Sequence, residues 1–392
     1  MHRPTTTTSS NREKKGNDAM KFTCDRNALN EAINVVSKAA SQKSTIPALE
    51  GILLEIREEG IVHLSAYDLS VSISYDLEAE DTEKGTVILS SKLFGEIIRK
   101  LPSCPVTVEI DNKTFLTTID GGNAHFTITG MSDENFPELP DVLSQDGIVL
   151  TYNDFRTMVR QTIFAVSITD LKPILTGVLF ELNREAGNVS AVAVDNFRLA
   201  IRKVPFVQVN GGFNKVVIPS RALNEMLKIL PDSEEETLEI SNGKNFVAFR
   251  FGNVKLVSRL LEGEFLDYKA ALPKEHKFYV DVNVREFTHI IDRAALMANS
   301  NIISPIRCNF DYDRIEISTV SNIGKFSDTM LTETFTENMV IGFNYKYMLA
   351  ALAACDDEEI RIELQSNLAP IILRPKDKDD YLFLVLPLRM KE

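Results

Sequence analysis

The sequence has few of the residues from which metal sites and disulfide frameworks are built. Its four cysteines are far apart and form no CxxC pair. This spacing favours reduced thiols in a cytoplasmic protein over a zinc site or a set of disulfides. None of the five histidines is spaced from another as a metal-binding pair would be. We therefore expect neither a metal ion nor a cofactor.

Long apolar runs and catalytic motifs are also lacking. No apolar run reaches eighteen residues, which argues against a transmembrane helix. The first nineteen residues have no apolar stretch of the kind found in secretory signals, and we expect a disordered extension at residues 1–19. P-loop, GxGxxG and GxSxG motifs are absent. We expect a binding or structural protein without catalytic residues.

One pattern of helix, strands, helix and strands occurs three times. The three opening helices begin about 130 residues apart, at residues 24–41, 152–167 and 284–298. The second of them shows one apolar face most clearly, at Phe155, Met158, Val159, Thr162, Ile163 and Val166.

A second helix follows strand-like runs in each copy, at residues 90–102, 219–231 and 344–355. A Leu-Pro pair ends the first two of these helices, and further strands complete each copy. Chance similarity of three unrelated domains is the alternative, but it does not explain the matched order. The sequence predicts an α+β fold with domains at residues 20–145, 146–272 and 273–392.

Charge is distributed unevenly between the helices and the rest of the chain. The six helices together carry +5, whereas the whole chain carries −13. Arg156 and Arg160 lie four residues apart on one helix face, as do Arg285, His289 and Arg293 in sequence. The helices either line a polyanion or show ordinary surface scatter. No base-reading motif accompanies them, so any nucleic-acid contact would be with phosphates and independent of sequence.

Several stretches in this order resemble the bacterial sliding clamp family, the beta subunits of DNA polymerase III. They are "MKFTCDRNALNEAINVVSKAA", "TIPALEGILLEI", "LTGVLFEL", "AVAVDNFRLA", "VIPSRALNEMLKIL", "FGNVKLVSRLLEGEFLDY" and "LPLRM". The resemblance implies a DNA-clamp fold, with two helices per domain packed on antiparallel sheets. It also implies a head-to-tail homodimeric ring around duplex DNA, with helices lining the hole.

The resemblance further implies the partners: duplex DNA, the DNA polymerase III catalytic subunit, the clamp loader, other polymerases and mismatch-repair proteins. The proteins would dock through short peptides in a pocket between domains two and three. Its matching residues are Leu175, Val194, Asn196, Phe197, Arg198, Leu199, Leu266, Pro370, Leu384, Val385, Leu386, Pro387, Leu388, Arg389 and Met390.

Two further sets of residues follow from the resemblance or from helix faces. The DNA-facing candidates are Lys43, Arg99, Lys100, Arg156, Arg160, Lys172, Arg221, Lys228 and Arg293. The dimer interface would join Phe126 and Ile128, on the last strand of domain one, to Leu296 and Met297, on the first helix of domain three. Ordinary core positions are the alternative for these four.

Some residues depart from the family pattern. Asn196-Phe197 stands where many relatives have Gly-His or Gly-Tyr, and Leu266 stands where many have Pro. These departures affect the expected peptide preference. A repeat-domain adaptor that binds peptides but no DNA is the alternative function, and a metal-dependent nuclease using the acidic clusters is a third.

The apolar C-terminal stretch "YLFLVLPLRM" is expected to be the closing strand of the third domain. Pro387 would end its ladder, and Leu386, Leu388 and Met390 would be free to line the partner groove.

Overall fold

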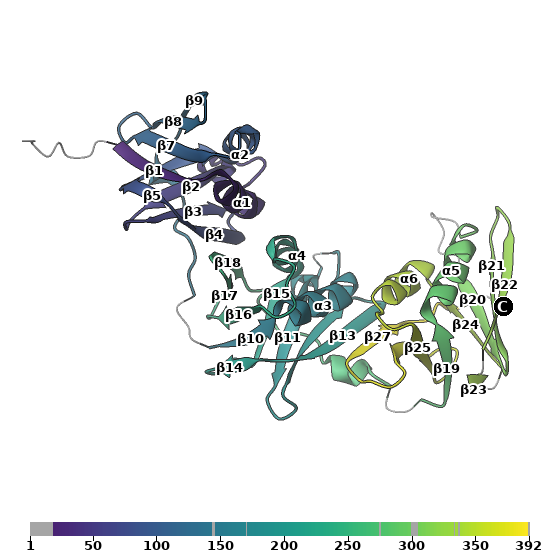
Figure 1. Cartoon of the computed structure of the whole chain (residues 1–392). Helices are drawn as coiled ribbons and strands as arrows, with labels where there is room; N and C mark the ends of the chain where they lie inside the picture. The colour runs from purple at the N-terminus through teal and green to yellow at the C-terminus, as the bar shows by residue number, and fades with distance from the viewer. Residues whose placement is uncertain are drawn as a thin grey trace, which may run out of the picture. The chain divides into compact units, whose positions relative to one another are not determined.

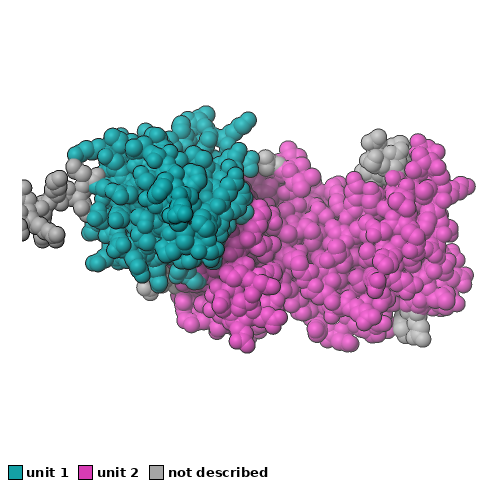
Figure 2. All heavy atoms as spheres, turned by 45° about the horizontal axis from the view of Figure 1, so that its top comes forward, with its two compact units in different colours: residues 1–139, 252–255 teal, residues 140–251, 256–392 magenta. Residues whose placement is uncertain are grey.

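The computed structural model describes residues 19–142, 146–169, 171–273, 276–298, 305–332, 334–335 and 338–390. The predicted disordered extension lies outside these residues except for Ala19, which already belongs to the first strand. The chain divides into two compact units, coloured separately in Figure 2. The first unit is the described part of residues 1–139 with 252–255, and the second is the described part of 140–251 and 256–392.

The first unit contains two helices and two groups of antiparallel strands (Figure 1). One sheet has the order β5-β1-β7-β8-β9, and the other strands are ordered β4-β3-β2-β6. The elements are β1 (Ala19–Asp25), α1 (Arg26–Val36), β2 (Gly51–Ile56), β3 (Ile61–Tyr67), β4 (Val71–Glu78), β5 (Glu80–Glu83), β6 (Gly85–Ser90), α2 (Ser91–Lys100), β7 (Pro105–Asp111), β8 (Leu116–Gly121) and β9 (Ala124–Thr129).

The second unit contains the second and third copies of the pattern. The elements of the second copy are β10 (Gly147–Thr151), α3 (Tyr152–Thr162), β11 (Gly177–Asn183), β12 (Asn188–Val194), β13 (Arg198–Pro205), β14 (Gln208–Asn210), β15 (Lys215–Pro219), α4 (Ser220–Ile229), β16 (Thr237–Asn242), β17 (Phe246–Phe251) and β18 (Val254–Arg259). Those of the third are β19 (Phe278–Asn283), α5 (Val284–Ala295), β20 (Ile306–Asp311), β21 (Arg314–Val320), β22 (Lys325–Leu331), β23 (Thr334–Phe335), β24 (Met339–Phe343), α6 (Tyr345–Ala353), β25 (Glu359–Leu364), β26 (Ile371–Pro375) and β27 (Tyr381–Val385).

All six predicted helices are present, and five begin at a side-chain cap. Asp25, Ser90, Thr151, Asn283 and Asn344 each accept a hydrogen bond from a backbone N–H of the first turn. Such a cap stabilises a helix by about 1 kcal/mol. The recurrence of the cap supplies a fixed reference point for comparing helix positions between copies.

The predicted buried face of the 152–167 helix is confirmed only in part. Phe155, Met158 and Val159 are fully buried. However, α3 ends at Thr162, so Ile163 lies in a following 3-10 turn and Val166 lies beyond that turn. Both are only half-buried. The apolar spacing in the sequence continues beyond Thr162, where the α-helix ends and the more tightly wound 3-10 turn begins.

The C-terminal strand joins the second and third copies into one sheet. β27 lies between β13 and β26 in a nine-stranded sheet of order β15-β11-β12-β13-β27-β26-β25-β19-β23. Phe383 and Val385 are fully buried because both sides of β27 are hydrogen-bonded and both faces are covered. The sequence predicted the strand, but not its pairing with β13.

Candidate functional site

The junction between β13 and β27 is an antiparallel ladder that runs from Arg198 opposite Val385 to Arg202 opposite Tyr381. Beside the ladder, the Phe164 and Phe383 rings meet edge to face, with their centroids 5.3 Å apart. Such aromatic contacts stabilise by about 1 kcal/mol beyond the area they bury. The junction therefore fixes the second and third copies against each other.

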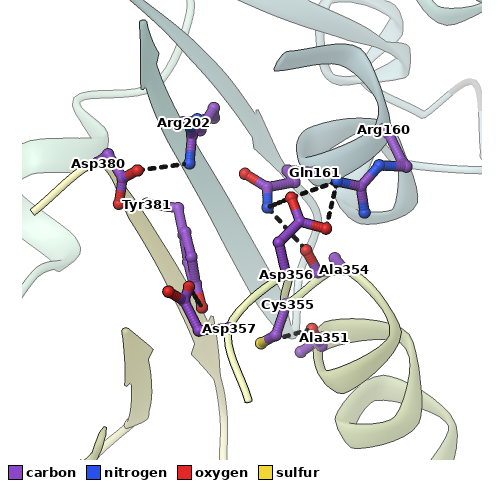
Figure 3. Close-up of polar contacts among 10 residues, drawn as sticks. All are labelled: Arg160, Gln161, Arg202, Ala351, Ala354, Cys355, Asp356, Asp357, Asp380 and Tyr381. Atoms are coloured by element: carbon purple, nitrogen blue, oxygen red, sulfur yellow. Dashed lines mark hydrogen bonds and ion pairs between the residues drawn. The ribbon is translucent and has the colours of Figure 1, made fainter. Parts of the chain in front are cut away.

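Polar side chains cross the same junction (Figure 3). The Arg160 Nη2 lies 2.5 Å from an Asp356 carboxylate oxygen, and Gln161 Nε2 donates to the Ala354 carbonyl at 2.9 Å. At the start of β27, Arg202 of β13 lies 2.9 Å from Asp380. Gln161 is fully buried, so its hydrogen bond satisfies a carbonyl at the end of α6 that no helical N–H reaches.

Two ionisable groups near this junction remain protonated at neutral pH. Burial raises the pKa of the Cys355 thiol to about 12. Burial also raises the pKa of Tyr381, whose hydroxyl donates to Asp357 at 2.9 Å. Neither group has the depressed pKa of a nucleophile, so we assign both a structural role.

The turn before β13 is held by Asp195. Its Oδ1 accepts the backbone N–H groups of Phe197 at 2.7 Å and Arg198 at 2.9 Å. Its Oδ2 lies 3.0 Å from Arg198 Nε, and both side chains are only 14% exposed. Phe197, by contrast, is 46% exposed and stacks on Tyr347 with ring centroids 5.6 Å apart. The guanidinium of Arg198 also lies over Tyr347, 4.8 Å from its centroid.

Four of the predicted pocket residues belong to one apolar cluster on the junction sheet: Leu175, Val194, Leu199 and Leu384. The sequence interpretation missed the other members, which are Leu179, Val192, Ile201, Val217, Tyr268 and Ile372. Tyr268 comes from the segment that includes Leu266, which is 44% exposed. The sequence did offer a signal for Tyr268, which is its place in the linker segment DYKAALP. A tyrosine in a linker between domains can be buried only if its ring packs on an apolar surface of a domain.

The backbone of the C-terminal residues is held by hydrogen bonds to neighbouring segments. The Leu386 N–H donates to the Phe197 carbonyl, and the Leu388 N–H donates to the Gly342 carbonyl, both at 2.8 Å. Met390 lies over Gly342, where an added Cβ would come within 2.8 Å of the methionine Cγ. Leu386 nevertheless remains 36% exposed. The backbone N–H groups beyond the end of β27 have no partner in the ladder, which explains why they form these hydrogen bonds.

The remaining predicted pocket residues are placed unevenly. Asn196 and Arg389 are exposed, whereas Pro370 and Pro387 are half-buried. Val385 is fully buried in the ladder, so it supports the surface and does not line it, which corrects its predicted role.

A cavity of about 770 Å³ opens beside the apolar cluster, whose members Ile201 and Tyr268 line it, but none of the predicted pocket residues do. It contains Glu181, whose carboxylate accepts from the Tyr268 hydroxyl at 2.7 Å and lies 3.1 Å from Lys269 Nζ. Burial opposes ionisation of Glu181, but these two hydrogen bonds outweigh it and lower its pKa. The charged groups named here are already paired with one another, so they do not point to a ligand.

The basic residues predicted to face DNA fall into two groups. Lys43, Arg99, Lys100, Lys172 and Arg221 are exposed. The other four are ion-paired: Arg156 with Asp232 at 3.5 Å, Arg160 with Asp356, Lys228 with Glu225 at 2.9 Å, and Arg293 with Asp328 at 2.5 Å. The sequence did not show these partners, which come from other elements or from the next helical turn.

The four predicted interface residues are not all core. Phe126 is 37% exposed on β9, the outer strand of its sheet among the described residues, and Ile128 is half-buried. Leu296 is 71% exposed and Met297 half-buried. Both follow α5, which ends at Ala295, so their predicted place on the helix is corrected by one and two residues.

Three family models match consecutive parts of the chain. They describe the N-terminal, central and C-terminal domains of the DNA polymerase III beta subunit, and match residues 20–140, 149–267 and 269–389. Beta sliding clamps of Staphylococcus epidermidis and Staphylococcus aureus are each 34% identical over 380 residues, covering 94% of this chain and 99% of theirs.

Solved structures agree with these matches. A DNA polymerase sliding clamp from Bacillus subtilis is 32% identical and has a TM-score of 0.88, covering 95% of this chain and 100% of that one. The beta subunit from DNA polymerase of Streptococcus pyogenes is 26% identical with a TM-score of 0.88, covering 94% and 100%. Among the described residues, no helix is both long and apolar enough to span a membrane.

Proposed function

The chain belongs to the family of DNA polymerase III beta subunits, and on this premise we propose how its residues work as a DNA sliding clamp. A sliding clamp is a non-catalytic subunit that makes DNA synthesis processive. The observation that carries the function is the match of three family models, in family order, to nearly the whole chain. We propose domain limits at residues 20–145, 146–272 and 273–392, and action in the cytoplasm.

The proposed ring is a head-to-tail homodimer, and the junction inside the second unit is its template. Gly121 in β8 and Pro375 in β26 hold equivalent ladder positions. Two residues before them, Ile119 pairs with Phe126, and Leu373 pairs with Phe383. Phe126 therefore occupies the place of Phe383. Phe383 is fully buried beside β13, whereas Phe126 lies on the outer strand of its sheet among the described residues and has no such neighbour.

The strand equivalent to β13 is β22, which borders the four-stranded sheet β22-β21-β20-β24 of the described residues. Counted from the N-cap, Leu296 holds the position of Phe164, thirteen residues along. Phe164 contacts Phe383, so we propose that Leu296 of one copy contacts Phe126 of the other. The proposed seam thus joins β22 and the end of α5 to β9.

DNA contact is proposed through the exposed basic side chains on or next to the helices. Such contacts are weak and depend on salt, because each mainly displaces a condensed counterion. Ion pairing of Arg156, Arg160, Lys228 and Arg293 reduces their attraction for phosphate further. Weak contacts suit a protein that is retained by encircling DNA and must still slide along it.

Partner proteins are proposed to dock on the apolar cluster of the junction sheet, between Phe197, Leu266 and Leu386. The three side chains are each 36–46% exposed, whereas Leu199 and Leu384 are buried. A short peptide with apolar side chains can cover them without moving the backbone. The proposed ligands are peptides of the polymerase, the clamp loader, other polymerases and mismatch-repair proteins.

Primer extension with bacterial DNA polymerase III and clamp loader on a circular template tests the function. The clamp is expected to lengthen the products at low polymerase concentration, where each product comes from one binding event. Val207→Ala changes an exposed side chain outside all proposed surfaces, so this variant should lengthen the products as the wild-type clamp does. Unchanged product length with a folded, dimeric protein would contradict the proposal.

A further inference from the structure

Equivalent helix positions meet at the internal junction and at the proposed seam. Counted from the N-cap, Arg160 near the end of α3 and Asp292 near the end of α5 are equivalent, nine residues along. By the same count, Ala354 after α6 and Lys100 at the end of α2 are equivalent, ten residues along. The ends of these four helices can therefore be compared directly.

At the internal junction, the first helix is positive and the facing helix end is negative. Arg160 projects from α3 and pairs at 2.5 Å with Asp356, two residues beyond Ala354. Figure 3 shows this pair beside Gln161, which donates to the same carboxylate at 3.0 Å. The charge therefore sits directly on the contact between the two helix ends.

At the proposed seam the signs are reversed. The α5 position equivalent to Arg160 is Asp292, which is exposed. The end of α2 carries Arg99 and Lys100, both exposed, and Pro102 holds the position of Asp356. Asp292 thus faces a positive helix end, whereas α5 as a whole carries no net charge.

We propose that this reversed polarity selects the seam, with Asp292 of one copy paired to Lys100 of the partner copy. This inference rests on the proposed head-to-tail dimer. A mismatched junction would place Arg160 against Lys100, or Asp292 against Asp356, and like charges at a contact are unfavourable. The polarity keeps the end of domain one from competing for the face that β27 and α6 already cover.

The proposed pairing also gives two of the predicted DNA-facing residues, Lys100 and Arg293, a place at the seam instead. Lys100 is used at the seam. Arg293 follows Asp292 and occupies the position of Gln161, whose side chain points into the internal junction. Arg293 is already held by Asp328 on β22, the strand proposed to face the partner.

Charge reversal tests the pairing in the full-length protein. The dimer dissociation constant is measured by sedimentation velocity for Lys100→Glu, for Asp292→Lys and for the double variant. Each single reversal is expected to weaken the dimer about tenfold at low salt, since it replaces an attraction with a repulsion. The double variant should return to within about twofold of wild type, because the pair is restored with its signs exchanged.

Lys84→Glu is the control, since it makes the same charge change at an exposed turn of the first unit away from α2 and β9. Unchanged melting temperatures verify that the exposed substitutions leave the fold intact. A stable wild-type dimer in which the double variant is as weak as the two singles combined would overturn the charge pairing and leave the ring standing. A monomeric wild type at micromolar concentration would overturn both.

Discussion

Replacing Phe126 by alanine tests the proposed seam through its apolar contact. Phe126 is 37% exposed in the single chain, whereas its equivalent Phe383 is fully buried. If the seam buries Phe126 equally, it removes about 75 Å² of a side chain that presents about 200 Å² in total. At about 25 cal/mol per Å², this burial stabilises each seam by about 2 kcal/mol.

A ring of two copies contains two seams, so Phe126→Ala should cost about 4 kcal/mol and raise the dimer dissociation constant about 1000-fold. Sedimentation velocity over a dilution series measures this constant. Leu296→Ala should act in the same direction, because Leu296 is the proposed contact of Phe126. Val207→Ala removes a side chain that is 59% exposed elsewhere and should leave the constant unchanged. A Phe126→Ala dimer as tight as wild type would refute the equivalence of β9 and β27.

Three further outcomes are expected. Deletion of residues 386–392 should abolish polymerase and clamp-loader binding in pull-down assays but leave the dimer closed, because apolar anchors dominate such pockets; normal stimulation of polymerase by the truncated protein would contradict the pocket. Gln161→Leu should destabilise the second unit by about 1–3 kcal/mol in denaturant melts, since it leaves the buried Ala354 carbonyl unpaired. Arg160→Gln should cost under about 1 kcal/mol, because the ion pair that it removes is exposed. Equal losses of stability in the two variants would contradict this difference between a buried and an exposed contact. The two-pronged hydrogen bond from Arg361 lowers the pKa of Asp281 below its usual 3.8, so its stabilisation exists above that value and is lost as the pH falls through the lowered pKa. Asp281→Asn should therefore melt earlier than wild type at neutral pH, and a difference that did not shrink as the pH falls below 3.8 would contradict this linkage.

The repeated architecture could be predicted because it is local. Helix faces have a 3.6-residue period, and Pro102 and Pro231 mark where two of the second helices cannot continue. Phe155, Met158 and Val159 were correctly predicted to be buried for this reason. The same reasoning failed at Ile163, because side-chain spacing does not show where an α-helix tightens into a 3-10 turn.

The junction could not be predicted, because strand periodicity does not identify a strand's neighbour. The sequence separates Ala200 from its ladder partner Phe383 by more than 180 residues. The hydrogen bonds of the C-terminal backbone could not be predicted for a related reason, since the carbonyl that receives the Leu388 N–H lies on another strand. The carboxylate opposite Arg160 likewise comes from another domain. The proposed seam is indicated by the comparison of Phe126 with Phe383. This comparison requires the strand register of both ladders, which the sequence does not show.

Retention on DNA tests topological encirclement most directly. The clamp is loaded on a nicked circular duplex by a bacterial clamp loader, separated from free protein by gel filtration, and the circle is then cut once. We expect the clamp to remain on the intact circle in moderate salt and to be lost from the cut molecule, because only the open ends release a closed ring. Equal retention on circular and linear DNA would contradict the central claim, since a protein held by phosphate contacts alone does not depend on DNA topology.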